Sequence, residues 1–159
     1  VLPDARDNAV FVSSLSRPPA NLGDNPITTA LTGVSQWVPW PIKVQPKHRY
    51  GIGTMAFIGD AAHAMPPYLA QGGAMAIEDA AVLSAAVARH GLTAEAVAHY
   101  GAQRTGRVKR LAAQTRRQGL IYHLPPPISF GRDMALRTLG AEGVLSQVSW
   151  IYGWNPPTP

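Results

Sequence analysis

The sequence predicts an α/β fold, in the form of an α+β fragment, from three neighbouring patterns. An apolar stretch over residues 54–58 is typical of a strand. An alanine-rich stretch over residues 71–89 carries apolar side chains at helical spacing and is followed by Gly91, a favourable C-terminal cap. Thr93 is the expected N-cap of a second helix, which the apolar pattern extends to about residue 118.

The segments on either side of this centre are less regular. Pro39 and Pro41 each remove a backbone donor, so residues 35–42 are expected to form an extended edge segment. The remaining expectations are a short strand over residues 9–15, a loop over 17–26, a turn and short helix over 122–139, and an aromatic patch over 150–154 that packs onto its neighbours.

Composition limits the classes of protein that the chain can represent. With 159 residues, 46% of them hydrophobic, it can form one core at most. The absence of cysteine excludes disulfides and thiolate metal sites and fits a cytoplasmic location. The longest apolar run, residues 80–88, is far shorter than the roughly 20 residues of a membrane span. Because the chain begins without Met and in mid-element, we expect it to be a fragment of a longer protein.

The formal net charge is +5, and its basic excess falls in the second half of the chain. A basic helix is compatible with nucleic-acid binding, but no aromatic side chains are interleaved with these charges and no zinc spacing occurs. We therefore favour a solvated helix face, with arginines directed away from the apolar stripe, and predict no nucleic-acid partner.

Residues 51–56 match the glycine pattern of dinucleotide-binding loops only formally. That pattern must follow a strand and open a helix, whereas here it follows polar residues and leads into the apolar stretch at 54–58. We interpret Gly51 and Gly53 as a turn that feeds a strand.

The chemistry is concentrated between residues 59 and 79. Asp60 follows an apolar strand, where open sheets bind ligands, and the small residues Gly59 and Ala61 let a ligand approach the backbone. Gly72 and Gly73 leave the amides of a helix start accessible to negative charge. The residues alone thus indicate a ligand-binding strand, loop and helix.

A second interpretation of the same residues is a metal site or a catalytic dyad. Asp60 and His63 are suitably spaced for either, with Glu78 and Asp79 as further carboxylates. Since no cysteine or second histidine lies nearby, we predict no metal site.

The whole segment resembles a known motif. Gly-Asp-Ala-Ala-His at 59–63, Pro-Pro at 66–67, Gln-Gly-Gly at 71–73 and Ala-Ile-Glu-Asp-Ala at 76–80 resemble the second FAD-binding motif of single-component flavoprotein aromatic hydroxylases, the salicylate and 3-hydroxybenzoate hydroxylase-like monooxygenases. The resemblance implies part of a Rossmann-like FAD-binding domain with remnants of a substrate-binding sheet. The implied division is 1–50 for the sheet, 51–92 for the FAD-binding part and 93–159 for a carboxy-terminal helical region.

The resemblance also assigns cofactor contacts. It implies that Asp60 binds the ribityl chain of FAD and that Gly59 and Ala61 line the cofactor. The helix start would offer backbone amides to the N1–C2=O edge of the flavin, where negative charge accumulates on reduction. The residues implied there are Gly72, Gly73 and Ala74.

Other positions receive catalytic or structural roles by the same route. Pro67 would lie beside the flavin ring, and Gln71 would face the substrate; these two are the catalytic candidates. His63 is implied to be a structural residue of the turn, and Glu78 and Asp79 to anchor the helix rather than to act as bases.

The implied reaction is hydroxylation of a small phenolic or benzoate-like substrate by FAD, NADH or NADPH, and O2. The amino-terminal FAD-binding half of such an enzyme is missing from the sequence, so the chain alone is expected to be inactive; a homodimer is compatible with the family. The alternative is a non-catalytic fragment or interaction module that keeps the fold of the motif without the cofactor.

Overall fold

The computed structural model describes residues 2–3, 9–10, 43–45 and 47–157, and its contacts divide the chain into two units, Val1–Ile42 and Lys43–Pro159. In the first unit β1 (Leu2–Pro3) pairs antiparallel with β2 (Ala9–Val10). β2 covers the beginning of the strand predicted at 9–15, while the predicted loop at 17–26 and edge segment at 35–42 lie outside the described residues. The division into a sheet part, an FAD-binding part and a helical region, with boundaries at 50/51 and 92/93, stays a prediction.

The second unit opens with a short hairpin. β3 (Gly51–Ile52) pairs antiparallel with β4 (Met55–Ala56), and Gly53 forms the turn with φ +56°, which confirms the turn and excludes a dinucleotide-binding loop. The strand predicted over 54–58 is shorter than expected, because only Phe57 continues the pairing, through its N–H to the carbonyl of Tyr50, before the chain bends. The pairings in the described residues are antiparallel, so the Rossmann-like arrangement remains a prediction.

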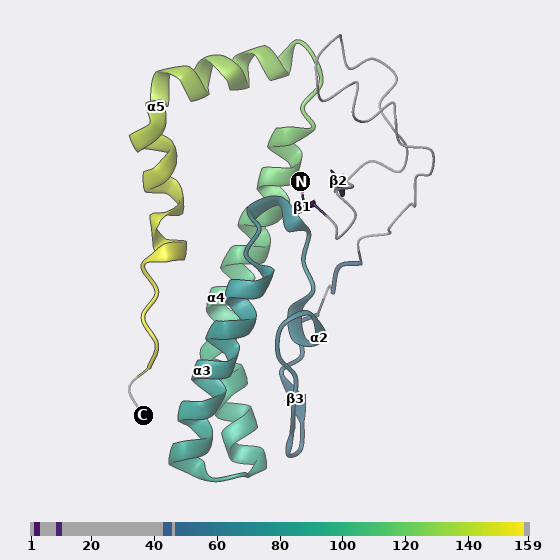
Figure 1. The fold of residues 1–159 in the computed structure, drawn as a ribbon, viewed down its shortest axis with the longest axis vertical. Coiled ribbons are helices and arrows are strands. Elements are labelled where there is room, and N and C mark those ends of the chain that lie inside the picture. Colours follow the sequence, from purple (N-terminus) through teal and green to yellow (C-terminus); the bar gives the residue numbers. More distant parts are fainter. Residues whose placement is uncertain (1, 4–8, 11–42, 46, 158–159) are drawn as a thin grey trace. The chain divides into compact units, whose positions relative to one another are not determined.

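Helices make up most of the described chain. They are α2 (Asp60–His63), the 3-10 helix η1 (Pro67–Leu69), α3 (Gly72–His90), α4 (Ala94–Tyr122) and α5 (Ile128–Tyr152). Figure 1 shows α3 and α4 side by side as an antiparallel pair joined by a tight connection. Both predicted caps are confirmed: the N–H of Gly91 donates to the carbonyl of Val87 at 2.8 Å, and the Thr93 hydroxyl accepts from the N–H of Ala96 at 3.2 Å.

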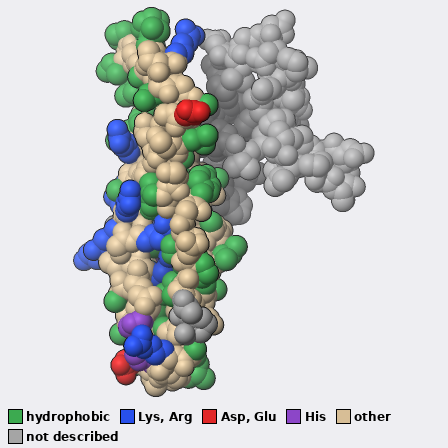
Figure 2. Space-filling view, turned by 90° about the vertical axis from the view of Figure 1, so that its left-hand side faces the viewer, with side chains coloured by type: hydrophobic (Ala, Val, Ile, Leu, Met, Phe, Trp, Pro, Cys, Tyr) green, Lys and Arg blue, Asp and Glu red, His purple; other side chains and the backbone are tan. Residues whose placement is uncertain are grey.

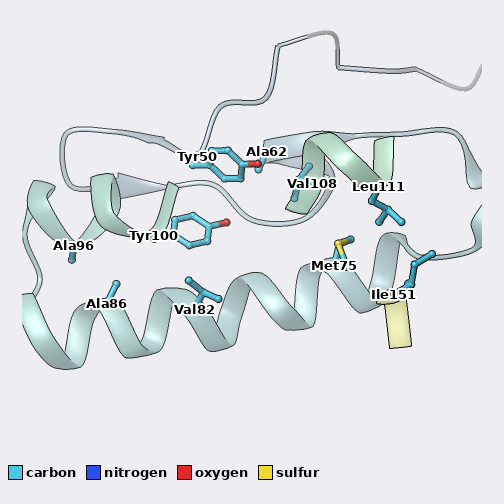
Figure 3. Close-up of a cluster of buried hydrophobic side chains, with 10 residues drawn as sticks. All are labelled: Tyr50, Ala62, Met75, Val82, Ala86, Ala96, Tyr100, Val108, Leu111 and Ile151. Atoms are coloured by element: carbon cyan, nitrogen blue, oxygen red, sulfur yellow. The ribbon is translucent and has the colours of Figure 1, made fainter. Parts of the chain in front are cut away.

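The core lies between the α3–α4 pair and the segment from Tyr50 to Ala62 (Figure 3). Tyr100 is fully buried there, packs edge-on against Tyr50 with ring centroids 5.6 Å apart, and donates its hydroxyl to the carbonyl of Phe57 at 2.9 Å. This contact fixes the chain immediately before the glycine-aspartate turn. The other buried members are Ala62, Met75, Val82, Ala86, Ala96, Val108, Leu111 and Ile151.

The carboxy-terminal helix is longer than predicted. The helix expected to end at residue 139 is confirmed, and Gly140 interrupts it with φ 63° and ψ −178°, but the chain then resumes a helix to Tyr152. Trp150 and Trp154 pack partly buried against the core, as expected for the aromatic patch. In the described part of the chain, no helix has the length and apolar character needed to cross a membrane.

Candidate functional site

The site is organised around a sharp turn at Gly59. Gly59 has φ +57° and ψ −138°, a conformation that side chains other than glycine rarely adopt. A Cβ at this position would lie 3.2 Å from the Cβ of Ala76, and the Gly59 N–H donates to Oδ2 of Asp79 at 2.9 Å. The turn therefore rests directly against the second turn of α3.

His63 is buried beneath the turn and links it to α3. The single turn of α2 brings its Nε2 to 2.6 Å from Oδ2 of Asp79, and the ring is 1% exposed. The amide N–H groups of Ala62 and His63 both donate to the carbonyl of Gly59 at 2.9 Å. The imidazole is thus a buried part of the turn, which is the structural position that the family resemblance implies.

Two arginines of α4 neutralise the carboxylates of α3. Arg104 is 1% exposed; its Nε donates to Oδ1 of Asp79 at 2.6 Å and its Nη1 to Oε2 of Glu78 at 2.7 Å. Arg107 forms a bidentate pair with the same Glu78. These contacts correct the expectation that the arginines lie away from the apolar stripe: two of them turn inward because α3 presents two buried carboxylates to them.

The pKa of Asp79 reflects this environment. Burial by itself would raise the pKa of the carboxyl, but hydrogen bonds from His63, from the backbone of Gly59 and from Arg104 outweigh burial and lower the pKa below its ordinary value of 3.8. Asp79 is therefore an ionised anchor for the turn and is not available as a general base at neutral pH.

The lowered pKa predicts an acid-sensitive fold. A carboxyl whose pKa is lower in the folded state stabilises the fold above its ordinary pKa of 3.8, and this contribution is lost as pH falls toward and through the folded-state pKa. Urea unfolding at a series of pH values should show the loss in the wild type and a shallower slope over the same window in Asp79→Asn. Equal slopes in the two proteins would contradict the assignment.

The predicted cofactor contacts fall at two backbone turns. Asp60 and Ala61 are exposed at the start of α2, while Gly72 and Gly73 form the first turn of α3 together with exposed Ala74. A Cβ on either Gly72 or Gly73 would meet nothing within 4 Å, so the backbone there borders open space. Because the Gly59 turn rests on Ala76, the two groups of predicted residues belong to elements that pack on each other.

The two catalytic candidates lie between these turns in sequence. Pro67 opens η1, whose next residue, Tyr68, packs on Gly119 of α4. Gln71 is the half-buried N-cap residue of α3. Pro67 thus precedes the residue that packs on the carboxy-terminal part of α4, while Gln71 adjoins the open helix start.

The residues present fit a ligand that combines hydroxyl groups with negative charge. Within the described residues, the Asp60 carboxylate has no side-chain hydrogen bond or ion pair and can accept hydrogen bonds from the hydroxyl groups of a ligand. The first amides of a helix lack partners within the helix, and the dipole places partial positive charge on them. An exposed carboxylate and an open helix start on two packed elements are suited to a ligand that joins a polyol chain to an anionic group.

Sequence reasoning missed Arg104 and Arg107 as parts of this site. A signal was present for Arg104, since it stands at helical spacing between Tyr100 and Val108 within the apolar stripe of α4. An arginine at a core position requires a carboxylate partner. For Arg107, which lies at the edge of the stripe, the sequence offers no comparable signal.

Comparison with known proteins identifies the family. A family model described as "FAD binding domain" matches residues 16–115. The chain is 34% identical over 117 residues to 3-hydroxybenzoate 6-hydroxylase from Klebsiella oxytoca, covering 70% of this chain and 28% of that protein. It is 33% identical over 135 residues to 3-amino-4-hydroxybenzoate 2-monooxygenase from Streptomyces cremeus, covering 84% and 33%.

A third relative is the FAD-dependent urate hydroxylase from Klebsiella pneumoniae, 38% identical over 93 residues, which are 58% of this chain and 22% of that protein. The chain belongs to the family of FAD-binding domains. It spans about a third or less of the length of these relatives.

Proposed function

We propose that the chain carries the flavin-ring side of an FAD site in a monooxygenase that hydroxylates a small phenolic or benzoate-like substrate with NADH or NADPH and O2. The observation that carries the proposal is an exposed Asp60 carboxylate in a turn that packs on α3, together with the open start of that helix, in a chain of the FAD-binding domain family. The hydroxybenzoate and aminohydroxybenzoate monooxygenases among its relatives support the substrate class.

Each backbone turn has a distinct task in this proposal. Asp60 accepts hydrogen bonds from the ribityl hydroxyls, and the small side chains of Gly59 and Ala61 let the cofactor approach. The amides of residues 72–74 hold the electron-rich edge of the ring system, and preorganised donors there favour the charge that develops on reduction. FAD, when bound, would supply the electron transfer and oxygen activation.

Pro67 and Gln71 face the reaction in this proposal. Pro67 borders one side of the flavin ring, and the amide of Gln71 orients the aromatic substrate from the N-cap of α3. A Rossmann-like arrangement completed by sequence outside this chain, the division at 50/51 and 92/93, a cytoplasmic location and a homodimer belong to the same proposal.

The test is FAD binding by the full-length protein encoded by the gene. The purified protein should show the visible absorption of oxidised flavin, or gain it when FAD is added. Asp60→Ala should weaken FAD binding by about 10-fold or more, as expected for a hydrogen bond to a charged group worth about 1.5–3 kcal/mol. Asp133→Ala, which removes an exposed carboxylate of α5, is the matched control and should leave FAD affinity unchanged.

The opposite results separate the alternatives. A full-length protein that takes up no flavin would favour the non-catalytic interaction module. Flavin binding that is equally strong in Asp60→Ala would reject the role of Asp60 while keeping the family function.

A further inference from the structure

We propose that Arg107 is a positioning residue that couples the end of α5 to the Gly59 turn. Docking of residues 150–154 would then set the geometry of the turn from which Asp60 projects. Only the consequence for FAD rests on the proposed function; the coupling itself is a property of the fold.

Arg107 donates hydrogen bonds to α3 on one side and to α5 on the other. In the described residues, no other side chain links these two helices by hydrogen bonds. On one side, its Nε and Nη2 donate to Oε2 and Oε1 of Glu78 at 2.6 and 2.5 Å. On the other side, its Nη1 and Nη2 donate to the carbonyls of Trp150 and Ile151 at 3.2 and 2.9 Å. Carbonyls in the last turn of a helix lack partners within the helix, so the guanidinium caps α5.

Apolar contacts hold the same segment in place. The Arg107 guanidinium carbon lies 5.5 Å from the Trp150 ring centroid and 5.8 Å from that of Trp154, and Arg104 lies 5.9 Å from Trp154. Ile151 is 4% exposed and belongs to the core (Figure 3). Residues 150–154 therefore dock on the two arginines and on the core at once.

From Glu78 an unbroken series of hydrogen bonds leads to the turn. Oε2 of Glu78 accepts from both Arg107 and Arg104. Arg104 also donates to Oδ1 of Asp79, whose Oδ2 accepts from the N–H of Gly59. The two carboxylates and two guanidinium groups balance in charge, so no member can leave without exposing an uncompensated buried charge.

Loss of Arg107 should therefore loosen the turn at Gly59. Glu78, 6% exposed, would keep only Arg104 as a cationic partner and would draw it away from Asp79. A weaker hold of Arg104 on Asp79 frees the carboxylate that fixes the Gly59 N–H. Lysine cannot replace arginine, because an ammonium lacks the planar fork that serves the carboxylate and the carbonyls together.

The experiment measures hydrogen exchange in the full-length protein without added FAD, both at the end of α5 and at the Gly59 turn. Arg107→Met and Arg107→Lys should each accelerate exchange in residues 148–154 and in residues 59–63. Lys109→Met is the control, since Lys109 is an exposed cation of the same helix that makes no hydrogen bond, ion pair or ring contact with Glu78, Asp79 or residues 150–154 in the described structure. It should leave residues 59–63 unchanged.

A second variant, in the docked segment, keeps the test valid if the Arg107 variants fail to fold. Trp154→Ala leaves all ion pairs in place and should still accelerate exchange at 59–63, because it loosens the docked segment. Faster exchange at 148–154 with unchanged exchange at 59–63, in Trp154→Ala and in either Arg107 variant, would overturn the coupling.

FAD binding separates this proposal from the function. If FAD binds, Arg107→Lys should weaken it by about 10-fold, within the range typical of coupled sites. A wild type that binds no FAD, but whose two segments respond together, would support the coupling and reject the proposed function.

Discussion

Arg104→Met is expected to lower the free energy of unfolding by about 3–5 kcal/mol, the usual cost of leaving a buried charge without its partner. Arg104 is 1% exposed and is the only cation in the described residues that pairs with Asp79 and Glu78 together. Methionine fills a similar volume but returns no charge, so both carboxylates lose a donor. Chemical denaturation at neutral pH measures the loss.

Matched variants test that reasoning. Arg117→Met removes an exposed arginine from the same helix and should change stability by no more than about 0.5 kcal/mol. Adding Asp79→Asn to Arg104→Met should recover part of the loss, because the unpaired charge disappears. A loss in Arg104→Met as small as that in Arg117→Met would show that the buried pairs contribute little.

Gly119→Ala is expected to destabilise the protein by about 1–3 kcal/mol, the usual cost of overpacking. A Cβ on Gly119 would overlap the ring of Tyr68, which η1 presses onto α4 at this point. The ring is also packed against Tyr122 and His123, with centroids 6.1 and 5.8 Å away, so it has little room to retreat. Thermal or chemical unfolding measures the change.

The same helix supplies the control. Gly106→Ala adds a Cβ that meets nothing within 4 Å, so it should stabilise α4 by roughly 0.5–1 kcal/mol through helix propensity alone. Replacing the ring with a smaller side chain, in Tyr68→Leu, should make Gly119→Ala much less destabilising. Equal effects of the two alanine substitutions would contradict a close approach of η1 to α4.

The positively charged surface that remains has no assigned role. Figure 2 shows lysine and arginine side chains spread along one face of the molecule, with hydrophobic side chains gathered at the end formed by the first half of α5. This face is consistent with a solvated helix surface for most of the basic residues. The exceptions within the described chain are Arg104, Arg107 and the partly buried Arg132, which donates to the carbonyl of Ile121 and pairs with Asp133.

Local patterns allowed much of the fold to be predicted. The caps at Gly91 and Thr93 act on the residues beside them, so they can be recognised without knowledge of the tertiary structure. The strand at 54–58 was overestimated because its length depends on pairing with Tyr50–Ile52, which its own residues do not reveal. The second part of α5 was missed because Gly140 ends one helix but, by adopting φ 63°, lets another begin.

Only the backbone features of the candidate site could be predicted from the sequence. Gly59 and the glycines at 72–73 mark close approach and a helix start directly in the sequence. The ion pairs behind them join residues 25 and 26 positions apart, and no local pattern encodes such a pairing. The support of the turn is a tertiary property, whereas its ligand-facing side is a local one.

Hydrogen exchange of the full-length protein with and without FAD tests the central claim most directly. FAD is expected to slow exchange of the amides in residues 59–62 and 72–74, and Asp60→Ala is expected to reduce this protection while Asp133→Ala is not. Bound FAD with unchanged exchange in both segments would contradict that claim.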